Sequence, residues 1–460
     1  MNAGDFPISG KIPFLLLEVT MKRIGLLTIF IFFFLHTGPV SASVLYTVKP
    51  GDSLWKIADQ YETSTDVLKK VNGITNGARI MPGQSVIIPG NTYHVTDGDT
   101  LWKVARMHQT SMANLKERNR LTSDIIVPGQ TLHIPESRKK PITAGAFFIP
   151  GSPVKNQQSI DYYGDYLSAL GMFEYRPDEN GTLSRMSGED SISRTWKKGL
   201  VPHATITNLT EEGFDPDLAH RLLSNETKRK DLIEHIAGLV DEKQYKGVII
   251  DFESLHQKDR SHFNTFIQDL SGRLHKIGGE VGTALPPMTG AYAPAHHQAY
   301  DYKTIGEAVD FVFLMTYNWH WLGGVPGAIA PIKKVDAVMN YAVTAIPKEK
   351  IFLGIAMYAY DWNTAKPEDV KAYSQQQAVD TAVEHQRPIQ YDYEKGSPWF
   401  TYTDQQGDLH EVWFEDARSI LAKYRLVKKY DIQGVGGWKT GLDFPQAGFL
   451  LKEEFIIKKR

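Results

Sequence analysis

"GVIIDFE" (247–253) has the composition of a buried strand, yet it ends in two acids. Its apolar residues favour a strand, and side chains along a strand alternate between its two faces. Asp251 and Glu253 therefore point the same way, about 7 Å apart along the strand. In a parallel barrel, polar groups at the carboxyl ends of strands face the active site. The stretch predicts a reaction site; the alternative is a structural acid pair that caps a helix or forms a salt bridge.

Strand-like runs of this kind recur along the second part of the chain. They alternate with amphipathic stretches such as 231–245 and 260–278, and this alternation indicates a parallel sheet. We therefore predict an α/β fold, a (β/α)8 TIM barrel over 142–460. The segment of about 361–430 is too long for one crossover, so we expect an α+β insertion before the last strand. The predicted strands are 144–149, 171–175, 200–208, 247–253, 281–287, 311–319, 351–360 and 434–438.

An internal repeat precedes the barrel. "YTVKPGDSLWKIADQY" (46–61) returns as "YHVTDGDTLWKVARMH" (93–108), and "PGQSVIIP" (82–89) returns as "PGQTLHIP" (128–135). Each unit is predicted to run strand, helix, helix, strand, and its Gly-Asp pair suits a turn followed by a helix cap. A unit of this size is marginal alone.

Both units resemble LysM modules from end to end, and we assign them to 45–89 and 92–135. The resemblance implies binding of glycans that contain N-acetylglucosamine. Trp55 and Trp102 are expected in the module cores, because tryptophan is buried on average. The ligand surface is expected at the turn after the first strand and the loop before the last.

The N-terminus has the pattern of a secretory signal peptide. Lys22 and Arg23 precede an apolar run, and small residues lead to an expected cleavage after Ala42. Translation is expected to start at Met21, so 1–42 would be absent from a secreted mature protein with no stable membrane span. An uncleaved anchor is the alternative, although the run is short for one. A short linker is expected at 136–141.

The composition excludes several kinds of site. A net charge of −2 argues against nucleic-acid binding, and the absence of cysteine excludes disulfides and thiolate metal sites. No cluster of metal ligands stands out, so neither a metal nor a cofactor is expected. His296 and His297 are expected to be solvated loop residues. We expect a monomer.

Aromatic residues with polar tips follow other predicted strands. Tyr317, Asn318 and Trp319 end one strand, Tyr358 ends another, and Trp438 ends the last. Aromatic faces stack on the C–H faces of pyranose rings, while nearby polar groups bind the hydroxyls. Core packing explains any one of these residues, but their recurrence at strand ends favours a sugar site.

These strand ends resemble glycoside hydrolase family 18, in particular the spore-associated peptidoglycan N-acetylglucosaminidases of Bacillus-type bacteria, which also carry tandem LysM modules. The resemblance covers nearly all of 142–460 and includes "VWFEDARSI" (412–420) and "GVGGW" (434–438). Glu253 matches the acid/base glutamate of the family motif and Asp251 the preceding aspartate. Lys246 and Ile249 stand where that motif has further acids, and Asn318 stands where many members have aspartate.

The resemblance implies a substrate-assisted mechanism. Glu253 would protonate the glycosidic oxygen, and the substrate's acetamide would attack its own anomeric carbon. Asp251 would orient the acetamide and Tyr317 would hydrogen-bond it. Trp438, Asn318, Tyr358 and Trp319 would bind the sugar, with Trp438 as the floor of the subsite.

The expected function is thus a secreted hydrolase that cleaves β-1,4 bonds after N-acetylglucosamine in cell-wall or spore-cortex peptidoglycan, held to its polymer by the LysM modules. A chitinase is one alternative, since chitin presents the same reacting sugar. A catalytically inactive glycan-binding lectin is the other.

Overall fold

The computed structural model describes residues 43–75, 79–108, 110–135, 139–290, 297–442 and 444–459. The expected signal peptide, its cleavage after Ala42 and the start at Met21 all lie outside these residues, as does part of the expected linker (136–138). Within them, no helix is long and apolar enough to cross a membrane.

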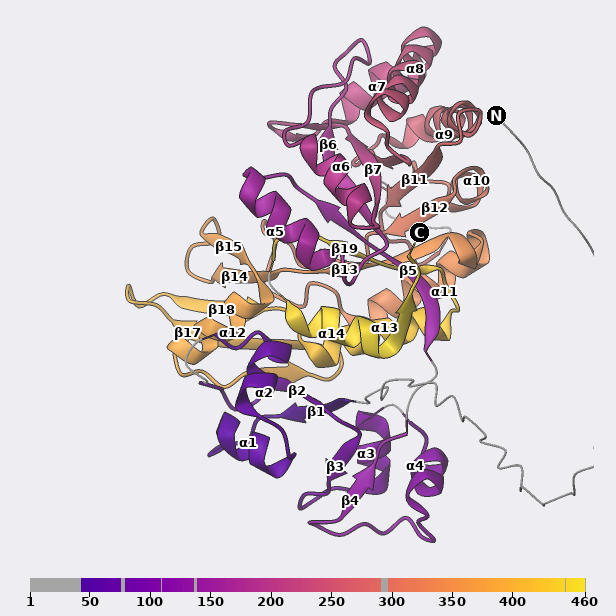
Figure 1. Cartoon of the computed structure of the whole chain (residues 1–460). Coiled ribbons are helices and arrows are strands. Elements are labelled where there is room, and N and C mark those ends of the chain that lie inside the picture. The colour runs from indigo at the N-terminus through magenta and orange to yellow at the C-terminus, as the bar shows by residue number, and fades with distance from the viewer. Residues whose placement is uncertain are drawn as a thin grey trace, which may run out of the picture. The chain divides into compact units, whose positions relative to one another are not determined.

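The repeat folds into two βααβ modules, as predicted (Figure 1). In each module the two strands pair antiparallel. The aspartate of each Gly-Asp pair fixes the turn after the first strand: Asp52 accepts hydrogen bonds from Lys49 N (2.7 Å) and Tyr46 Oη (2.8 Å), while Ser53 caps the helix. The elements are β1 (Ser43–Thr47), α1 (Leu54–Gln60), α2 (Thr65–Asn72), β2 (Ser85–Pro89), β3 (Thr92–His94), α3 (Leu101–Met107), α4 (Met112–Asn119) and β4 (Thr131–His133).

The two module tryptophans are not core residues, so that prediction was wrong. Trp55 is 66% exposed and Trp102 is 54% exposed. In α1 the buried positions are Leu54, Ile57 and Ala58. Their spacing of three and four residues already fills the inward face of a helix, and a residue one position after Leu54 points about 100° away from it.

Among the described residues, eight parallel strands close into a barrel, as predicted. The first and last strands, β5 and β19, pair in parallel and complete the ring. Gly247 opens β10 where a Cβ would lie 2.0 Å from the Glu280 carbonyl oxygen, so only glycine permits this approach of β11. The strands are β5 (Lys140–Phe148), β6 (Ala169–Tyr175), β7 (Val201–Thr207), β10 (Gly247–Asp251), β11 (Glu280–Leu285), β12 (Phe311–Leu314), β13 (Ile351–Ala356) and β19 (Gly434–Trp438).

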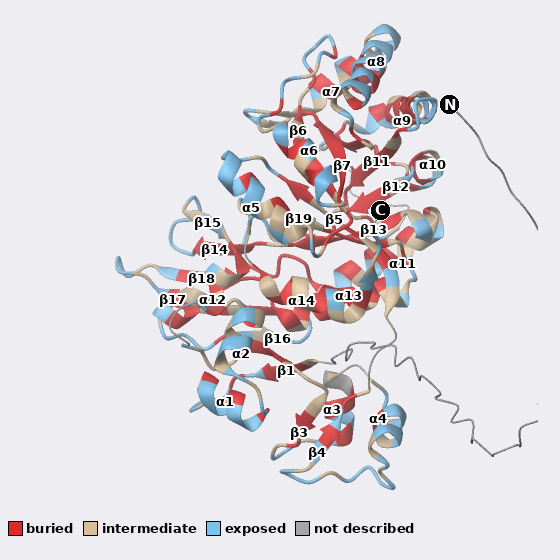
Figure 2. Cartoon of the chain, viewed as in Figure 1, coloured by how far each residue is buried: buried red, intermediate tan, exposed pale blue. Residues whose placement is uncertain are grey.

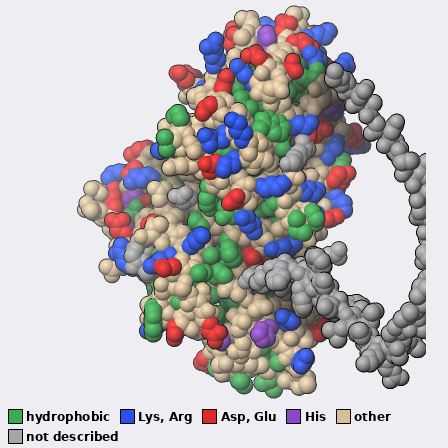
Figure 3. Space-filling view, in the orientation of Figure 1, with side chains coloured by type: hydrophobic (Ala, Val, Ile, Leu, Met, Phe, Trp, Pro, Cys, Tyr) green, Lys and Arg blue, Asp and Glu red, His purple; other side chains and the backbone are tan. Residues whose placement is uncertain are grey.

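Helices cover the barrel strands. Figure 2 shows the strands mostly buried, while α8 and α9 carry exposed outer faces. Acidic and basic side chains are interspersed over the face seen in Figure 3. The helices are α5 (Pro153–Tyr163), α6 (Asp190–Lys197), α7 (Pro216–Ser224), α8 (Glu226–Lys243), α9 (Arg260–His275), α10 (Tyr302–Ala308), α11 (Ile332–Ala345), α13 (Ala417–Lys429) and α14 (Pro445–Glu454). Shorter elements are β8 (Leu209–Thr210), β9 (Gly213–Phe214), η1 (Gln257–Asp259), η3 (Lys348–Lys350) and β20 (Phe455–Ile457), which pairs with β5.

An insertion between β13 and α13 forms a five-stranded antiparallel sheet with one helix, in the place where the sequence predicts α+β structure. Buried Asp361 holds it together by accepting hydrogen bonds from Tyr402 Oη (2.7 Å), Tyr373 Oη (3.1 Å) and His410 Nδ1 (2.8 Å). Its elements are β14 (Ala359–Asn363), β15 (Val370–Tyr373), α12 (Gln375–Glu384), β16 (Gln390–Asp392), β17 (Ser397–Thr403) and β18 (Leu409–Trp413).

The first LysM module contacts helices of the barrel through buried polar groups. Gln446 of α14 donates from Nε2 to Asn72 Oδ1 and to the Ser85 carbonyl, both at 2.8 Å. Arg418 of α13 donates to the Gly83 carbonyl at 3.0 Å. Because a buried polar group is costly when unpaired, these bonds favour one fixed contact.

Candidate active site

Asp251 and Glu253 line a cavity of about 710 Å³ at the carboxyl ends of the barrel strands. β10 ends at Asp251, and Glu253 follows just beyond the strand. Tyr317, Asn318, Trp319 and Trp438 line the same cavity, so the fold brings together residues predicted from separate strand ends.

A buried amide holds the backbone at the glutamate. Asn208 follows β7 and is fully buried. Its Oδ1 accepts from Glu253 N at 2.8 Å, and its Nδ2 donates to the Glu253 carbonyl at 2.9 Å. Two bonds from one side chain fix both the position and the orientation of the peptide that carries the acid. Asn208 ends a predicted strand, but the sequence gives no sign of this role.

The chain then turns sharply away from the site. Ser254 adopts a left-handed conformation (φ 58°), which is uncommon for a residue with a side chain. Tyr300 braces this turn, because its hydroxyl donates to the Phe252 carbonyl at 2.9 Å and accepts from Leu255 N at 3.4 Å.

Burial changes the titration of both acids. Loss of hydration raises the pKa of Asp251 to about 7, with a further contribution from the nearby charge of Glu174. Burial also raises the pKa of Glu253 well above its usual range, and the charge of Asp251 adds to the effect. Two carboxyls in one dehydrated site resist double ionisation, so the site favours the protonated form of Glu253.

Asp251 has one carboxylate oxygen with no protein partner. Its Oδ1 is buried and makes no hydrogen bond within the described chain. Such a buried acceptor is costly to leave unpaired. It therefore suits a donor that arrives with a ligand.

Glu174, at the end of β6, is a third acid close enough to influence Asp251. Arg176 donates to Glu174 Oε1 from Nε (3.0 Å) and from a terminal guanidinium nitrogen. Thr207 Oγ1 lies 3.4 Å from the other carboxylate oxygen. Nothing local to β6 relates Glu174 to β10, so the sequence alone does not predict its place beside Asp251.

Tyr317 is buried beside the acids. Burial, followed by the charges of Asp251 and Glu253, raises the pKa of its hydroxyl well above the usual range. The hydroxyl therefore stays protonated and available as a donor.

Asn318 lies at the centre of a group of tyrosines. It adopts a left-handed conformation (φ 60°), and its Oδ1 accepts from Tyr358 Oη at 2.5 Å and from Tyr360 Oη at 3.0 Å. Tyr358 is buried behind Asn318 and is not part of the cavity lining. The structure thus places it as a support for Asn318, and its predicted contact with substrate stays a prediction.

Several aromatic side chains line the cavity. Trp438 packs edge-on against Phe173 (4.9 Å between ring centroids) and tilts against Phe147 at 5.3 Å. Trp321 also lines the cavity and is 57% exposed. His297, expected to be a solvated loop residue, lines the cavity as well.

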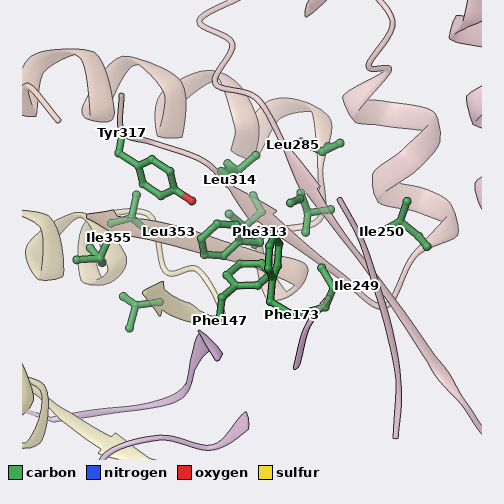
Figure 4. Close-up of a cluster of buried hydrophobic side chains, with 14 of the residues drawn as sticks. Phe147, Phe173, Ile249, Ile250, Leu285, Phe313, Leu314, Tyr317, Leu353 and Ile355 are labelled. Carbon is green, nitrogen blue, oxygen red and sulfur yellow. The ribbon is translucent and has the colours of Figure 1, made fainter. Parts of the chain in front are cut away.

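Apolar side chains from several barrel strands cluster inside the barrel (Figure 4). Phe147 and Phe313 meet edge to face at 5.2 Å between centroids, and Ile249 lies in the same cluster. Lys246 precedes β10, and its Nζ donates to the Gly278 carbonyl at 2.9 Å. Neither Ile249 nor Lys246 lines the cavity, so both departures from the family motif lie outside its lining.

Comparison with known proteins identifies both parts of the chain. The family model "Glycosyl hydrolases family 18" matches residues 218–443, and "LysM domain" matches 46–89 and 93–135. The cortical fragment-lytic enzyme of Bacillus subtilis is 40% identical over 90% of this chain and 99% of its own length. That of Bacillus anthracis is 36% identical over the same shares.

A solved structure agrees with this result. The crystal structure of the Bacillus cereus spore cortex-lytic enzyme SleL superposes with a TM-score of 0.84 at 34% identity, and covers 91% of this chain and 99% of its own. The similarity extends through the LysM modules and the barrel. The chain is therefore a glycosidase that belongs to glycosyl hydrolases family 18.

Proposed function

We propose that the chain is a secreted enzyme that cleaves β-1,4 bonds after N-acetylglucosamine in peptidoglycan, by substrate-assisted catalysis with retention of configuration. The observation that carries the proposal is the pair Asp251 and Glu253 in one cavity, with Asp251 Oδ1 unpaired among the described residues. The similarity to a cortical fragment-lytic enzyme and to a spore cortex-lytic enzyme supports peptidoglycan as the polymer and action outside the cell.

In the first step, protonated Glu253 gives its proton to the glycosidic oxygen. The carbonyl oxygen of the substrate's 2-acetamido group bonds to the anomeric carbon as the glycosidic bond breaks. An oxazolinium ion forms, and the shortened glycan leaves as an alcohol. Asp251 accepts a hydrogen bond from the acetamide N–H, and its charge stabilises the positive charge that develops. The Tyr317 hydroxyl donates to the acetamide carbonyl.

In the second step, the Glu253 carboxylate takes a proton from water. The water oxygen bonds to the anomeric carbon, the oxazolinium ring opens, and the acetamide is restored. Two displacements at the same carbon give net retention. Glu253 is again protonated, so the cycle closes without any further reactant. The indole of Trp438, which lines the cavity, can stack on the reacting sugar.

The substrate and bond can be tested together. Purified enzyme is incubated with spore cortex, vegetative cell wall or chitin, and the new reducing ends are identified by mass spectrometry after borohydride reduction. We expect reduced N-acetylglucosamine from peptidoglycan, with the β-anomer appearing first by NMR. Reduced N-acetylmuramic acid, or an initial α-anomer, would contradict the proposal. Faster release from chitin than from peptidoglycan would move the substrate to chitin, which presents the same sugar.

A further inference from the structure

Outside the cavity, the fold brings His220 next to Asp259 and His262, which lie 39 and 42 residues further along the chain. His220 lies in α7, His262 in the first turn of α9, and Asp259 at the N-cap position of α9. His220 Nδ1 is 2.7 Å and His262 Nδ1 is 3.0 Å from the same oxygen, Asp259 Oδ1. The three ligand atoms lie within 4.8 Å of one another.

The aspartate has features that an ordinary helix cap lacks. Asp259 is fully buried and makes no side-chain capping bond to α9. Its second oxygen, Oδ2, is buried and has no hydrogen-bond partner in the described chain. A buried carboxylate with an unpaired oxygen is costly unless a cation or donor compensates it. An ion from solvent can reach the cluster past the two histidines, because their side chains are 32% and 38% exposed.

We infer that His220, Asp259 and His262 form a binding site for a divalent transition-metal ion of the zinc type. Two imidazole nitrogens and one carboxylate oxygen are a donor set that suits Zn²⁺, with water in the remaining position. Three atoms bound tetrahedrally to one Zn²⁺ lie about 3.3 Å apart. The observed separations of 2.7 and 3.0 Å reach this value with small side-chain rotations.

The ion joins two segments that meet near the active site. Asp259 is six residues beyond Glu253, at the end of the segment that follows the catalytic glutamate. His220 belongs to the helix that follows β7 and Asn208. Metal binding therefore ties α7 to the start of α9 and restrains the segment between Glu253 and α9. The proposed hydrolysis does not need this ion, so the two proposals fail independently.

The test uses the full chain without an affinity tag that contains histidine. After treatment with EDTA and its removal by dialysis, Zn²⁺ is titrated by calorimetry into wild type and into His220→Gln, His262→Gln and His275→Gln. His275 is the matched control, because its Nε2 also contacts one aspartate, Asp310, at 3.0 Å, but no second histidine in the described part of the chain joins that pair. We expect one Zn²⁺ per wild-type chain, unchanged in His275→Gln and weaker by about 10–100-fold or more in the other two variants.

Two further measurements keep the test valid if a variant folds poorly. Co²⁺ bound to wild type should show the intense visible absorption of a tetrahedral site. Zn²⁺ should also slow backbone hydrogen exchange in residues 254–262. The inference is overturned if wild type binds no stoichiometric Zn²⁺, if His220→Gln and His262→Gln bind it as tightly as wild type does, or if hydrogen exchange in 254–262 is unchanged at saturating Zn²⁺.

Discussion

The first step of the proposed reaction requires a proton on the Glu253 carboxyl. Glu253→Gln keeps the shape of the side chain but cannot give a proton to the glycosidic oxygen. General acid catalysis contributes about 10²–10⁴-fold, so we expect kcat to fall by at least that factor while glycan binding remains. Release of reducing ends from peptidoglycan measures the effect. Glu368→Gln, at an exposed position of the insertion, is the control; wild-type rates in Glu253→Gln would place the reaction elsewhere.

The raised pKa of Asp251 predicts a stability that depends on pH. In the unfolded chain an aspartate ionises near pH 4, whereas in the fold the pKa of Asp251 is about 7. Between these values the folded state holds more protons, so stability falls as pH rises through this window. Asp251→Asn removes the buried charge. We expect its Tm to exceed that of wild type by an amount that grows from pH 4 to pH 7. A Tm difference that stays constant from pH 4 to pH 7 would contradict the raised pKa of Asp251.

Asn318 stands where many family members have aspartate. Because its Oδ1 already accepts both tyrosine hydroxyls, Asn318→Asp can keep these bonds. A new carboxylate in the same cavity favours protonation of the neighbouring acids. We therefore expect an active enzyme whose activity is retained to higher pH. A pH–rate profile shifted to lower pH would contradict this reading.

At the scale of elements, the end of β7 positions the end of β10 through Asn208. In Asn208→Ala the backbone at Glu253 loses two hydrogen bonds, and the acid is no longer held in line with its target. We expect kcat to fall by about 10–100-fold with a small change in KM, because a displacement of 1 Å can cost about 10² in rate. Asn156→Ala is the matched control, since Asn156 is also a buried asparagine with a backbone bond, in α5. An equal loss of kcat in both variants would indicate general destabilisation.

The elements show what local sequence can predict. All eight barrel strands were predicted because buried parallel strands are continuous apolar runs. The average burial of tryptophan predicts a core position for Trp55, but Leu54, Ile57 and Ala58 already fill the inward face of α1. Local sequence does not indicate the roles of Asn208 and Glu174, because their partners lie on other parts of the barrel. His220 and Asp259 are 39 residues apart and meet only after the barrel has formed.

At the scale of the whole molecule, the LysM modules present exposed indoles to solvent. Aromatic faces suit sugar rings, so we expect Trp55→Ala with Trp102→Ala to weaken binding to insoluble peptidoglycan by several-fold and to leave activity on soluble fragments unchanged. A pull-down assay beside a soluble-substrate assay measures both. Point substitutions are preferable to deletion of the modules, because deletion exposes Gln446 and its neighbours. Unchanged binding would assign the glycan surface to the module loops instead.

The hydrogen bonds from Gln446 and Arg418 to the first LysM module join this module directly to the catalytic barrel. If the proposed hydrolysis takes place while the first module is bound to peptidoglycan, this contact limits the active site to bonds within a fixed distance of the bound sugar. We then expect turnover on insoluble polymer to depend on the rate at which the module dissociates, so that tighter binding by the module would slow the release of product.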